Sequence, residues 1–296
     1  MKILVTGASG RLGCSLCRLL KESAIDFVAV DKFPNEQVEY PVESADLTYW
    51  QICERLMEGV DALVHFANYS NFNAATPEIL YTANTAMNMN LFQAAANAGC
   101  RRIIFASSIQ VLDGQLPTMD RASQENVLNY LPVDAGAPAL PRNAYALSKQ
   151  AGEQMLSYFS DTAGITGIAI RFPLLVDWEF MRELKVTNGM NRGNAYDLFA
   201  YLPVYSAAEA CFQAIMANVD GYRNYFVASK DNLEQRPGRE IVEQEMADLP
   251  CRKPIEELDT LVDCSKVVAE LGWDQPQSLD ESLAKYKGRE SIKPYD

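Results

Sequence analysis

Two periods of hydrophobic and polar positions alternate along the chain. Short apolar runs bounded by turn residues predict buried strands, and stretches with apolar residues three or four positions apart predict amphipathic helices. The expected strands of the first half are 3–5, 25–30, 38–42, 62–67, 102–108 and 167–171. The expected helices between them are 11–20, 48–57, 77–97 and 143–163. This alternation predicts an α/β fold, a doubly wound parallel sheet with helices on both faces.

The remaining segments have a weaker pattern. Residues 112–141 lack a period and predict a long loop, and 174–203 predict an irregular lid or substrate lobe. The further expected elements are a strand at 202–206, a helix at 207–218, a strand at 225–228 and helices at 239–247 and 265–271. The last ten residues are charged and are expected to be loose. We therefore expect one domain at 1–171 and, at 172–296, mostly a smaller C-terminal lobe with segments that return to the core.

Three glycines follow the first expected strand and open the first expected helix. Residues 1–13 read M-K-I-L-V-T-G-A-S-G-R-L-G. Gly7 permits the turn, Gly10 allows backbone N–H groups to approach a pyrophosphate, and Gly13 allows the helix to pack close to the strand. Asp31 ends the second apolar run, where an acid accepts a hydrogen bond from an adenosine ribose. We expect 1–171 to bind a dinucleotide; the alternative is a glycine-rich turn that only packs.

Composition narrows the class of protein. The chain has 296 residues and is 48% hydrophobic, enough to bury a sizeable core. Its formal net charge of −13, without a basic stripe, argues against a nucleic-acid partner. No apolar run approaches the length needed to span a bilayer, and the N-terminus lacks a signal-peptide pattern. We expect a cytoplasmic protein that binds no membrane.

The seven cysteines are scattered and odd in number, which indicates reduced thiols. Cys14 and Cys17 form a C-x-x-C on the first helix, and the chain has one histidine, His65. A zinc site would need more ligands, so no metal is expected. A redox pair is possible at this motif; the alternative is two small residues packed against the sheet.

Three residues carry candidate chemistry. Tyr145 and Lys149 stand four apart on one expected helix and therefore share a face. A nearby ammonium favours the phenolate and lowers the pKa of a tyrosine, so the pair could exchange a proton with a carbinol or carbonyl. Ser108 ends an expected strand at the carboxyl edge, where open α/β sheets bind ligands, and could orient the substrate oxygen.

The chain resembles the extended short-chain dehydrogenase/reductase family, in its NAD-dependent epimerase/dehydratase branch, over nearly its whole length. The resemblance implies a Rossmann domain at 1–171 with a substrate lobe after it. Beside the glycine turn and Asp31, six stretches carry it: Asp46-Leu47, H-F-A-N at 65–68 (H-x-A-A in the family), the N-T-A-M-N segment from Asn84, F-A-S-S at 105–108, Y-A-L-S-K at 145–149 and D-C-S-K-V-V-A-E-L-G-W at 263–273.

The resemblance also implies roles for residues. A hydride would pass between a nicotinamide and a sugar carbon, with Tyr145 as acid/base, Lys149 as its tuner and Ser108 as orienter. The charge of Asp31 favours NAD, whereas Lys32 and Arg11 leave NADP open. The implied cofactor-binding residues are Gly7, Gly10, Arg11, Leu12, Gly13, Asp31, Asp46, Leu47, Phe66, Ala67, Asn84, Tyr145 and Lys149.

Within the family, R-F-P at 171–173 and the compact length are most similar to uronate dehydrogenase-like members. By that resemblance Ser70, Ser108, Gln110 and Arg171 would face the substrate, and Arg171 could pair with a carboxylate through two hydrogen bonds. Uronate dehydrogenases have F-A-S-S-N-H where this chain has F-A-S-S-I-Q, so two polar contacts to a uronic acid are replaced.

Three functions remain open on the sequence. The first is an NAD-dependent oxidoreductase that acts on a sugar or sugar acid, and the second is a nucleotide-sugar epimerase or dehydratase with tightly bound NAD. The third is a non-catalytic NAD(P)-binding regulator. The resemblance also suggests a homodimer through the helices at 77–97 and 145–163.

Several other side chains are weaker candidates. His65 is expected to shape the cofactor loop rather than to transfer a proton. Trp178 and Tyr205 could line the pocket, but core packing is at least as good an interpretation. Four arginines could bind an anionic substrate group or could instead be solvated or paired with acids: Arg182, Arg192, Arg236 and Arg239.

Overall fold

The computed structural model describes residues 1–113, 128–187, 189 and 197–289. Its central feature is one parallel sheet, whose strands are β1 (Lys2–Thr6), β2 (Asp26–Asp31), β3 (Val42–Ser44), β4 (Ala62–His65), β5 (Arg102–Ser108), β6 (Thr166–Phe172) and β9 (Tyr222–Phe226). Their order across the sheet is β3-β2-β1-β4-β5-β6-β9. The doubly wound parallel sheet expected from the sequence is therefore confirmed.

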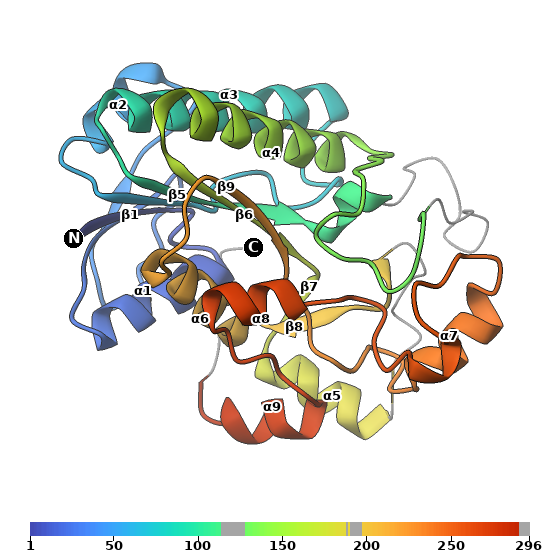
Figure 1. Cartoon of the computed structure of the whole chain (residues 1–296). Coiled ribbons are helices and arrows are strands. Elements are labelled where there is room, and N and C mark those ends of the chain that lie inside the picture. Colours follow the sequence, from blue (N-terminus) through green and yellow to red (C-terminus); the bar gives the residue numbers. More distant parts are fainter. Residues whose placement is uncertain (114–127, 188, 190–196, 290–296) are drawn as a thin grey trace.

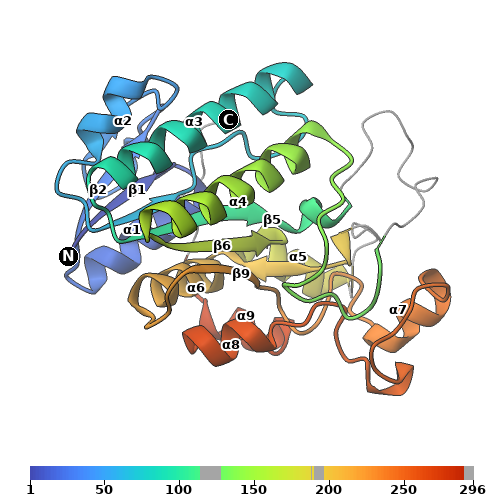
Figure 2. The same cartoon turned by 45° about the horizontal axis from the view of Figure 1, so that its top comes forward.

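Helices cover both faces of this sheet. They are α1 (Arg11–Glu22), α2 (Trp50–Leu56), α3 (Pro77–Asn97), α4 (Ala144–Ala163), α6 (Val204–Met216) and α8 (Ser265–Leu271). Helices α2, α3 and α4 lie on one face, and α1, α6 and α8 lie on the other (Figures 1 and 2). Neighbouring residues of a strand enter opposite cores: Ile3 and Val5 pack with Leu16 of α1, whereas Leu4 packs with Leu91 of α3.

Close packing between α4, α3 and the sheet depends on Gly152. A Cβ at this position would lie 2.4 Å from Cζ of Phe105 and 2.8 Å from Nδ2 of Asn88. The absence of a side chain therefore lets α4 approach β5 and α3 at the level of the candidate catalytic residues.

Residues after β6 form a smaller lobe and also complete the sheet. The lobe contains a two-stranded parallel sheet, β7 (Leu174–Val176) with β8 (Tyr201–Pro203), and the helices α5 (Trp178–Thr187), α7 (Gly238–Glu245) and α9 (Leu279–Lys285). Strand β9 pairs with β6 and so lies at the edge of the main sheet. Two short 3₁₀ helices complete the described elements, at Ile109–Leu112 and Ile255–Glu257.

Some expected element bounds were wrong. The third strand begins at Val42 rather than at residue 38, because Pro41 has no N–H for the ladder; Val42 pairs with Ala29. Residues 202–206 are not one strand. Pro203, with φ of −56°, ends β8 and directly precedes α6, which begins three residues earlier than expected.

Other expectations concern the loops. Residues 174–203 were expected to be irregular but contain β7, α5 and β8. The expected loop at 112–141 includes 114–127, and the loose end includes 290–296; both segments lie outside the described residues. The described part of the loop is tied to the second lobe, because Leu131 N donates to Pro250 O (2.8 Å) and Val133 N to Leu261 O (2.9 Å). In the described part of the chain, no helix has both the length and the apolar character for crossing a membrane.

Candidate active site

The glycine turn lies between β1 and α1. Gly7 has a φ of +72°, and a Cβ there would lie 2.7 Å from the backbone N of Ala67. A Cβ on Gly13 would lie 2.1 Å from the carbonyl oxygen of Gly7. Gly10 is the N-cap of α1 and has no side chain to cover the first N–H groups of the helix. The turn and the open helix N-terminus fit the pyrophosphate of a dinucleotide.

Asp31 lies at the carboxyl end of β2, beside this turn. Its Oδ2 accepts from the backbone N of Ser9 (2.9 Å), and its Oδ1 accepts from the N of Phe33 (3.1 Å). Across the next connection, Lys32 Nζ lies 2.8 Å from Asp46 Oδ2. The hydrogen bond from Lys32 lowers the pKa of Asp46 to about 2. Two carboxylates, those of Asp31 and Asp46, therefore stand near the carboxyl end of β2.

The remaining expected cofactor residues are divided between surface and core. Arg11, Leu12, Phe66 and Ala67 are half-buried around the glycine turn. Leu47 is buried in the core beneath α2 and α3.

Asn84 is fully buried on α3. Its Oδ1 accepts from Tyr69 N (2.8 Å), and its Nδ2 donates to Ser148 Oγ (3.0 Å). Asn84 therefore fixes the loop after β4 to α4. Ser70 follows in the same loop and is exposed.

Ser108, Tyr145 and Lys149 come together at the carboxyl end of β5. Ser108 Oγ accepts from Gln110 N (3.2 Å), which orients the hydroxyl at the end of the strand. Tyr145 lies in the first turn of α4, and Lys149 Nζ lies 5.7 Å from the centroid of its ring. Lys149 Nζ also donates to the carbonyl of Ala106 (2.8 Å). All three candidate side chains are buried.

Burial controls the ionisation of the pair. Desolvation raises the pKa of Tyr145 to about 12, although the hydroxyl of Ser108 opposes this shift. Desolvation also lowers the pKa of Lys149 to about 7. The sequence had suggested a lowered phenol pKa; in the fold, removal of the phenol from water raises this pKa instead. Tyr145 is thus a protonated phenol at neutral pH.

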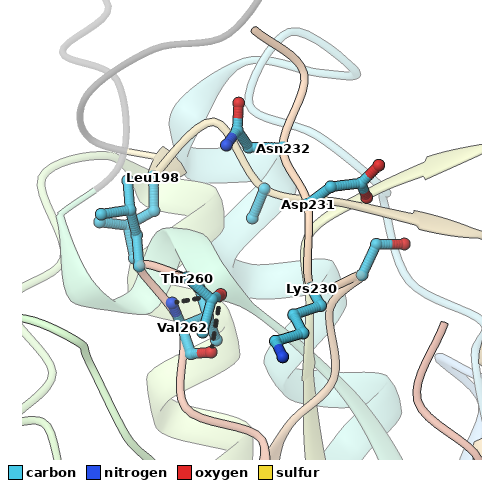
Figure 3. A pocket seen from close by; sticks show the side chains of 9 residues that line it. Leu198, Lys230, Asp231, Asn232, Thr260 and Val262 are labelled. Carbon is cyan, nitrogen blue, oxygen red and sulfur yellow. Dashed lines mark hydrogen bonds between the residues drawn. The ribbon is translucent and has the colours of Figure 1, made fainter. Parts of the chain in front are cut away.

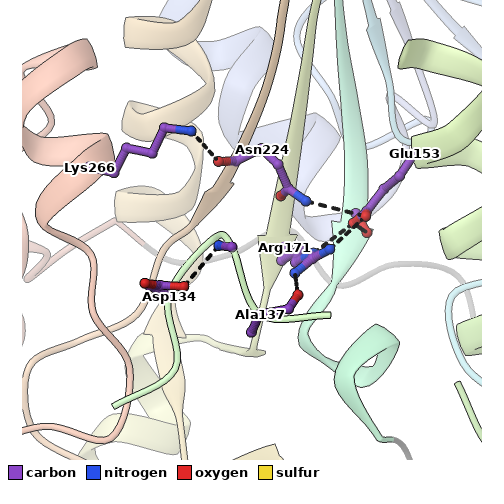
Figure 4. Close-up of polar contacts among 8 residues, drawn as sticks. Asp134, Ala137, Glu153, Arg171, Asn224 and Lys266 are labelled. Carbon is purple, nitrogen blue, oxygen red and sulfur yellow. Dashed lines mark hydrogen bonds and ion pairs between the residues drawn. The ribbon is translucent and has the colours of Figure 1, made fainter. Parts of the chain in front are cut away.

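Arg171, expected to face a substrate carboxylate, forms a buried ion pair with Glu153 (Figure 4). Its Nε and Nη2 donate to Oε1 and Oε2 of Glu153, each at 2.8 Å, and its Nη1 donates to Ala137 O (3.1 Å). Ser107 Oγ and Asn224 Nδ2 also donate to Glu153, at 2.5 and 3.3 Å. The edge of the guanidinium that could bind a substrate carboxylate through two hydrogen bonds is therefore already occupied by Glu153.

Glu153 was missed in the sequence. The signal was present, because Tyr145, Lys149 and Glu153 recur every four residues and so share one helix face. Gln110, another expected substrate residue, is half-buried, and its Oε1 accepts weakly from Nδ2 of Asn143 (3.5 Å).

Most of the weaker candidates have structural contacts. Trp178 Nε1 donates to Leu283 O (3.1 Å), and the Arg182 guanidinium lies over the Trp178 ring. Tyr205 accepts from Arg18 and stacks on Tyr286.

Two arginines on the second lobe are in different surroundings. Arg236 pairs with Glu245 (2.6 Å), whereas Arg239 is exposed. Arg192 lies outside the described residues.

The histidine and the C-x-x-C motif also have core positions. Burial lowers the pKa of His65 to about 3, so the ring is neutral. Cys14 and Cys17 are free and buried against the sheet, which is the packing interpretation. In the described ranges, no three His, Cys, Asp or Glu side chains gather where they could hold a metal ion.

A small hollow lies in the second lobe, and no residue that the sequence had suggested for the site is among those that line it (Figure 3). Thr260 Oγ1 bonds to the backbone of Val262 at its wall. It is lined by Leu198, Ala200, Ser229, Lys230, Asp231, Asn232, Thr260, Leu261 and Val262.

Fold and site together define a class: a Rossmann-type α/β protein with a glycine turn that fits a dinucleotide and a Ser–Tyr–Lys group at the carboxyl edge of its sheet.

Comparison with known proteins narrows this class. Residues 3–176, more than half of the chain, match the NAD dependent epimerase/dehydratase family. The chain therefore belongs to that family.

Relatives with known names include dehydrogenases and epimerases. Uronate dehydrogenase of Pseudomonas syringae pv. tomato is 33% identical over 177 residues, which is 57% of this chain and 58% of that protein. UDP-glucose 4-epimerase of Azospirillum brasilense is 27% identical, over 58% of this chain and 48% of that protein. The chain thus matches only about half the length of these relatives.

Solved structures show the same fold. A short-chain dehydrogenase/reductase superfamily protein from Agrobacterium tumefaciens with bound NAD has a TM-score of 0.69 and 16% identity. The match covers 96% of this chain and 95% of that chain.

Proposed function

We propose that this protein is an NAD-dependent oxidoreductase that acts on a hydroxyl or carbonyl group of a sugar or sugar acid. The observation that carries the proposal is the group formed by Ser108, Tyr145 and Lys149, buried at the carboxyl end of β5. The glycine turn beside β4 supplies the second half of the argument, because it fits a pyrophosphate.

The residues of the turn would hold the cofactor. The N–H groups at the start of α1 would bind the pyrophosphate, Asp31 the adenosine ribose and Lys149 the nicotinamide ribose. When bound, NAD supplies the acceptor or donor of a hydride.

The chain's own residues would move the proton. Ser108 Oγ would orient the substrate oxygen, and Tyr145 Oη, protonated at neutral pH, would give its proton to a carbonyl oxygen or take it back from a hydroxyl. Lys149 would lie beside the Tyr145 ring and favour the ionised form of its phenol.

The substrate-facing residues of the proposal are Ser70, Ser108 and Gln110. Arg171 was the candidate for binding a carboxylate, but Glu153 occupies it, so recognition of a uronic acid would depend on other groups. A neutral sugar and a sugar acid are therefore both retained as substrate classes.

The test is a panel of aldoses, uronic acids and polyols with NAD, followed by NADH absorbance. Tyr145→Phe is expected to lower kcat at least ~100-fold, because it removes the proton that the hydroxyl or carbonyl exchanges. Tyr158→Phe is the matched control, since Tyr158 is exposed on the same helix. Unchanged turnover in Tyr145→Phe would reject the assignment.

The second candidate is a nucleotide-sugar epimerase or dehydratase, which the similarity to a UDP-glucose 4-epimerase favours. In that case the cofactor is regenerated in every cycle. Protein purified without added cofactor would then carry NAD and would convert a nucleotide sugar with no net release of NADH.

A further inference from the structure

Lys149 has a second side-chain neighbour that the sequence analysis did not assign. Its Nζ donates to Oδ1 of Asn68 at 2.9 Å, in addition to the carbonyl of Ala106 at 2.8 Å. Asn68 lies in the loop after β4, 81 residues away in the chain. Two of the three N–H groups of a lysine ammonium are thereby fixed by the protein.

The amide of Asn68 is held in one orientation. Its Nδ2 donates to Ala67 O (2.7 Å) and to Oδ1 of Asn88 on α3 (3.1 Å). Because both amide hydrogens are used on that side, the Oδ1 of Asn68 faces Lys149.

Asn88 is fixed in turn by His65. The Oδ1 of Asn88 also lies 2.9 Å from Nε2 of His65, and Nδ1 of His65 lies 2.7 Å from Oγ1 of Thr6. An amide oxygen only accepts, so the neutral ring carries its proton on Nε2 and accepts from Thr6. This hydrogen-bonded row links Lys149 to β1.

This arrangement leaves the amide nitrogen of Asn88, Nδ2, buried without a hydrogen bond to any of the described residues. It points toward Gly152, where a Cβ would approach it to 2.8 Å. The side chain is therefore oriented for its oxygen, and α4 leaves room for it.

We propose that Asn68 is a positioning residue for Lys149, which holds the Nζ beside Tyr145 and commits it to act as a triple donor. The inference rests on the proposed role of Lys149 in the reaction. An uncharged amine has two N–H groups, and Asn68 and Ala106 already take both. A third acceptor, such as a ribose hydroxyl, can receive a hydrogen from Lys149 only when the group is an ammonium.

The other charged and polar groups around Lys149 have partners or roles of their own, so Asn68 is the residue to substitute in a test. On α4 itself, Tyr145 lies one turn before and Glu153 one turn after, and Glu153 is paired with Arg171. From β4, His65 is neutral, and from β5 the ring of Phe105 lies 5.1 Å from Nζ. Asp197 raises the pKa of Tyr145 from the segment before β8.

The experiment weakens and strengthens the hydrogen-bond acceptor at position 68. Asn68→Ala removes the oxygen, and Asn68→Asp replaces it with a carboxylate of nearly the same shape. Ala also stands at this position of the H-x-A-A motif that 65–68 resemble, so the variant suits the loop. Asn97→Ala, an exposed asparagine at the end of α3, is the control.

The readout is the titration of Lys149 in cofactor-free protein, followed by NMR of ¹³C-labelled lysine and assigned with Lys149→Met. The midpoint is expected to fall by about one pH unit in Asn68→Ala, because a hydrogen bond to the ammonium is lost. It is expected to rise by at least about one pH unit in Asn68→Asp, because an opposite charge is added. Asn97→Ala should follow the wild type.

The midpoint of the pH profile of turnover is expected to follow the same order: lowest in Asn68→Ala, intermediate in the wild type and highest in Asn68→Asp. Coincident Lys149 titrations in all three proteins would overturn the inference, whatever the activity. Ordered titrations without turnover of any sugar would instead reject the proposed function and leave the contact between Asn68 and Lys149 standing.

Discussion

Gly13 shows how one missing side chain shapes the glycine turn between β1 and α1. Its Cβ would overlap the carbonyl oxygen of Gly7 and approach Cα of Ala8 to 2.7 Å, and backbone atoms cannot move aside as a flexible side chain can. Gly13→Ala is therefore expected to lose NAD binding in titration calorimetry. It should also lower the free energy of unfolding by about 1–3 kcal/mol.

Gly10→Ala is the stability control for this change. A Cβ at Gly10 would lie 3.4 Å from Gly7 O, an ordinary contact. Its unfolding curve should stay close to that of the wild type, and equal stabilities of Gly13→Ala and Gly10→Ala would contradict the steric argument.

His65 gives the protein a pH-dependent stability that can be isolated, because it is the only histidine in the chain. The folded state keeps it neutral down to about pH 3, whereas the unfolded chain protonates it below about pH 6.5. Below pH 6.5 the unfolded state therefore binds more protons, and stability falls as the pH falls. The expected loss from His65 between pH 8 and pH 5 is about 2 kcal/mol.

Denaturant unfolding at several pH values measures this loss. His65→Gln keeps an amide N–H for Asn88 but does not titrate, so the stability of the wild type relative to this variant should fall by about 2 kcal/mol between pH 8 and pH 5. A constant difference from pH 8 to pH 5 would show that His65 does not carry the dependence.

At the scale of elements, the pair formed by Glu153 and Arg171 connects α4 to β6 and to the loop that precedes α4. Arg171→Met leaves a carboxylate buried without its partner and is expected to cost about 3–5 kcal/mol of unfolding free energy. The double variant Arg171→Met with Glu153→Leu should recover most of this loss. A denaturant double-mutant cycle measures the coupling.

The same pair separates two roles for Arg171. If it only positions α4, Arg171→Lys should lower kcat by the same factor on neutral aldoses and on uronic acids. A rise in KM confined to the acidic substrates would show instead that Arg171 binds a carboxylate.

The elements that the sequence predicted well carry their own stop signals. The helix at 77–97 was predicted with its observed bounds, because Pro77 suits the first turn and Gly99 suits the end. The strand at 102–108 also agrees with β5. Helices α5 and α9 were missed because their apolar residues pack within the small lobe, where Leu184 and Leu279 meet, and no long period reveals them.

The residues of the candidate site could be predicted only where the local sequence pattern places them, by helical spacing or at the end of a strand. The pairing of Tyr145 with Lys149 follows from helical spacing, and Ser108 from the end of a strand. The contacts of Arg171 with Glu153 and of Lys149 with Asn68 join segments that fold together from different strands and helices. Nothing in the local sequence fixes which polar group faces which, so these partners required the structure.

On the scale of the whole molecule, the outer faces of α3 and α4 form the surface on which we expect two copies to associate. The two helices pack side by side (Figure 2). Their large exposed apolar side chains are Ile79, Met89, Leu147 and Tyr158. We propose that this face forms a homodimer. Light scattering is expected to give twice the mass of the chain, 32.9 kDa, at micromolar concentration.

Met89→Glu combined with Tyr158→Glu should shift the protein to the monomer, because two charges enter an apolar contact. Val186→Glu is the control, since Val186 on α5 is the most exposed large apolar side chain among the described residues. A monomeric wild type over the full concentration range would contradict the proposal.

The order of the strands in the sheet has a consequence for folding during synthesis on the ribosome. Strand β6 keeps an open edge until β9 pairs with it, and the outer side of α1 waits for α6. A nascent chain that has emerged only as far as β6 therefore exposes an unpaired strand and an apolar helix face during translation. Holding factors that bind such surfaces would act on this chain late in synthesis, and pauses between β6 and β9 would be the moments at which aggregation competes with folding.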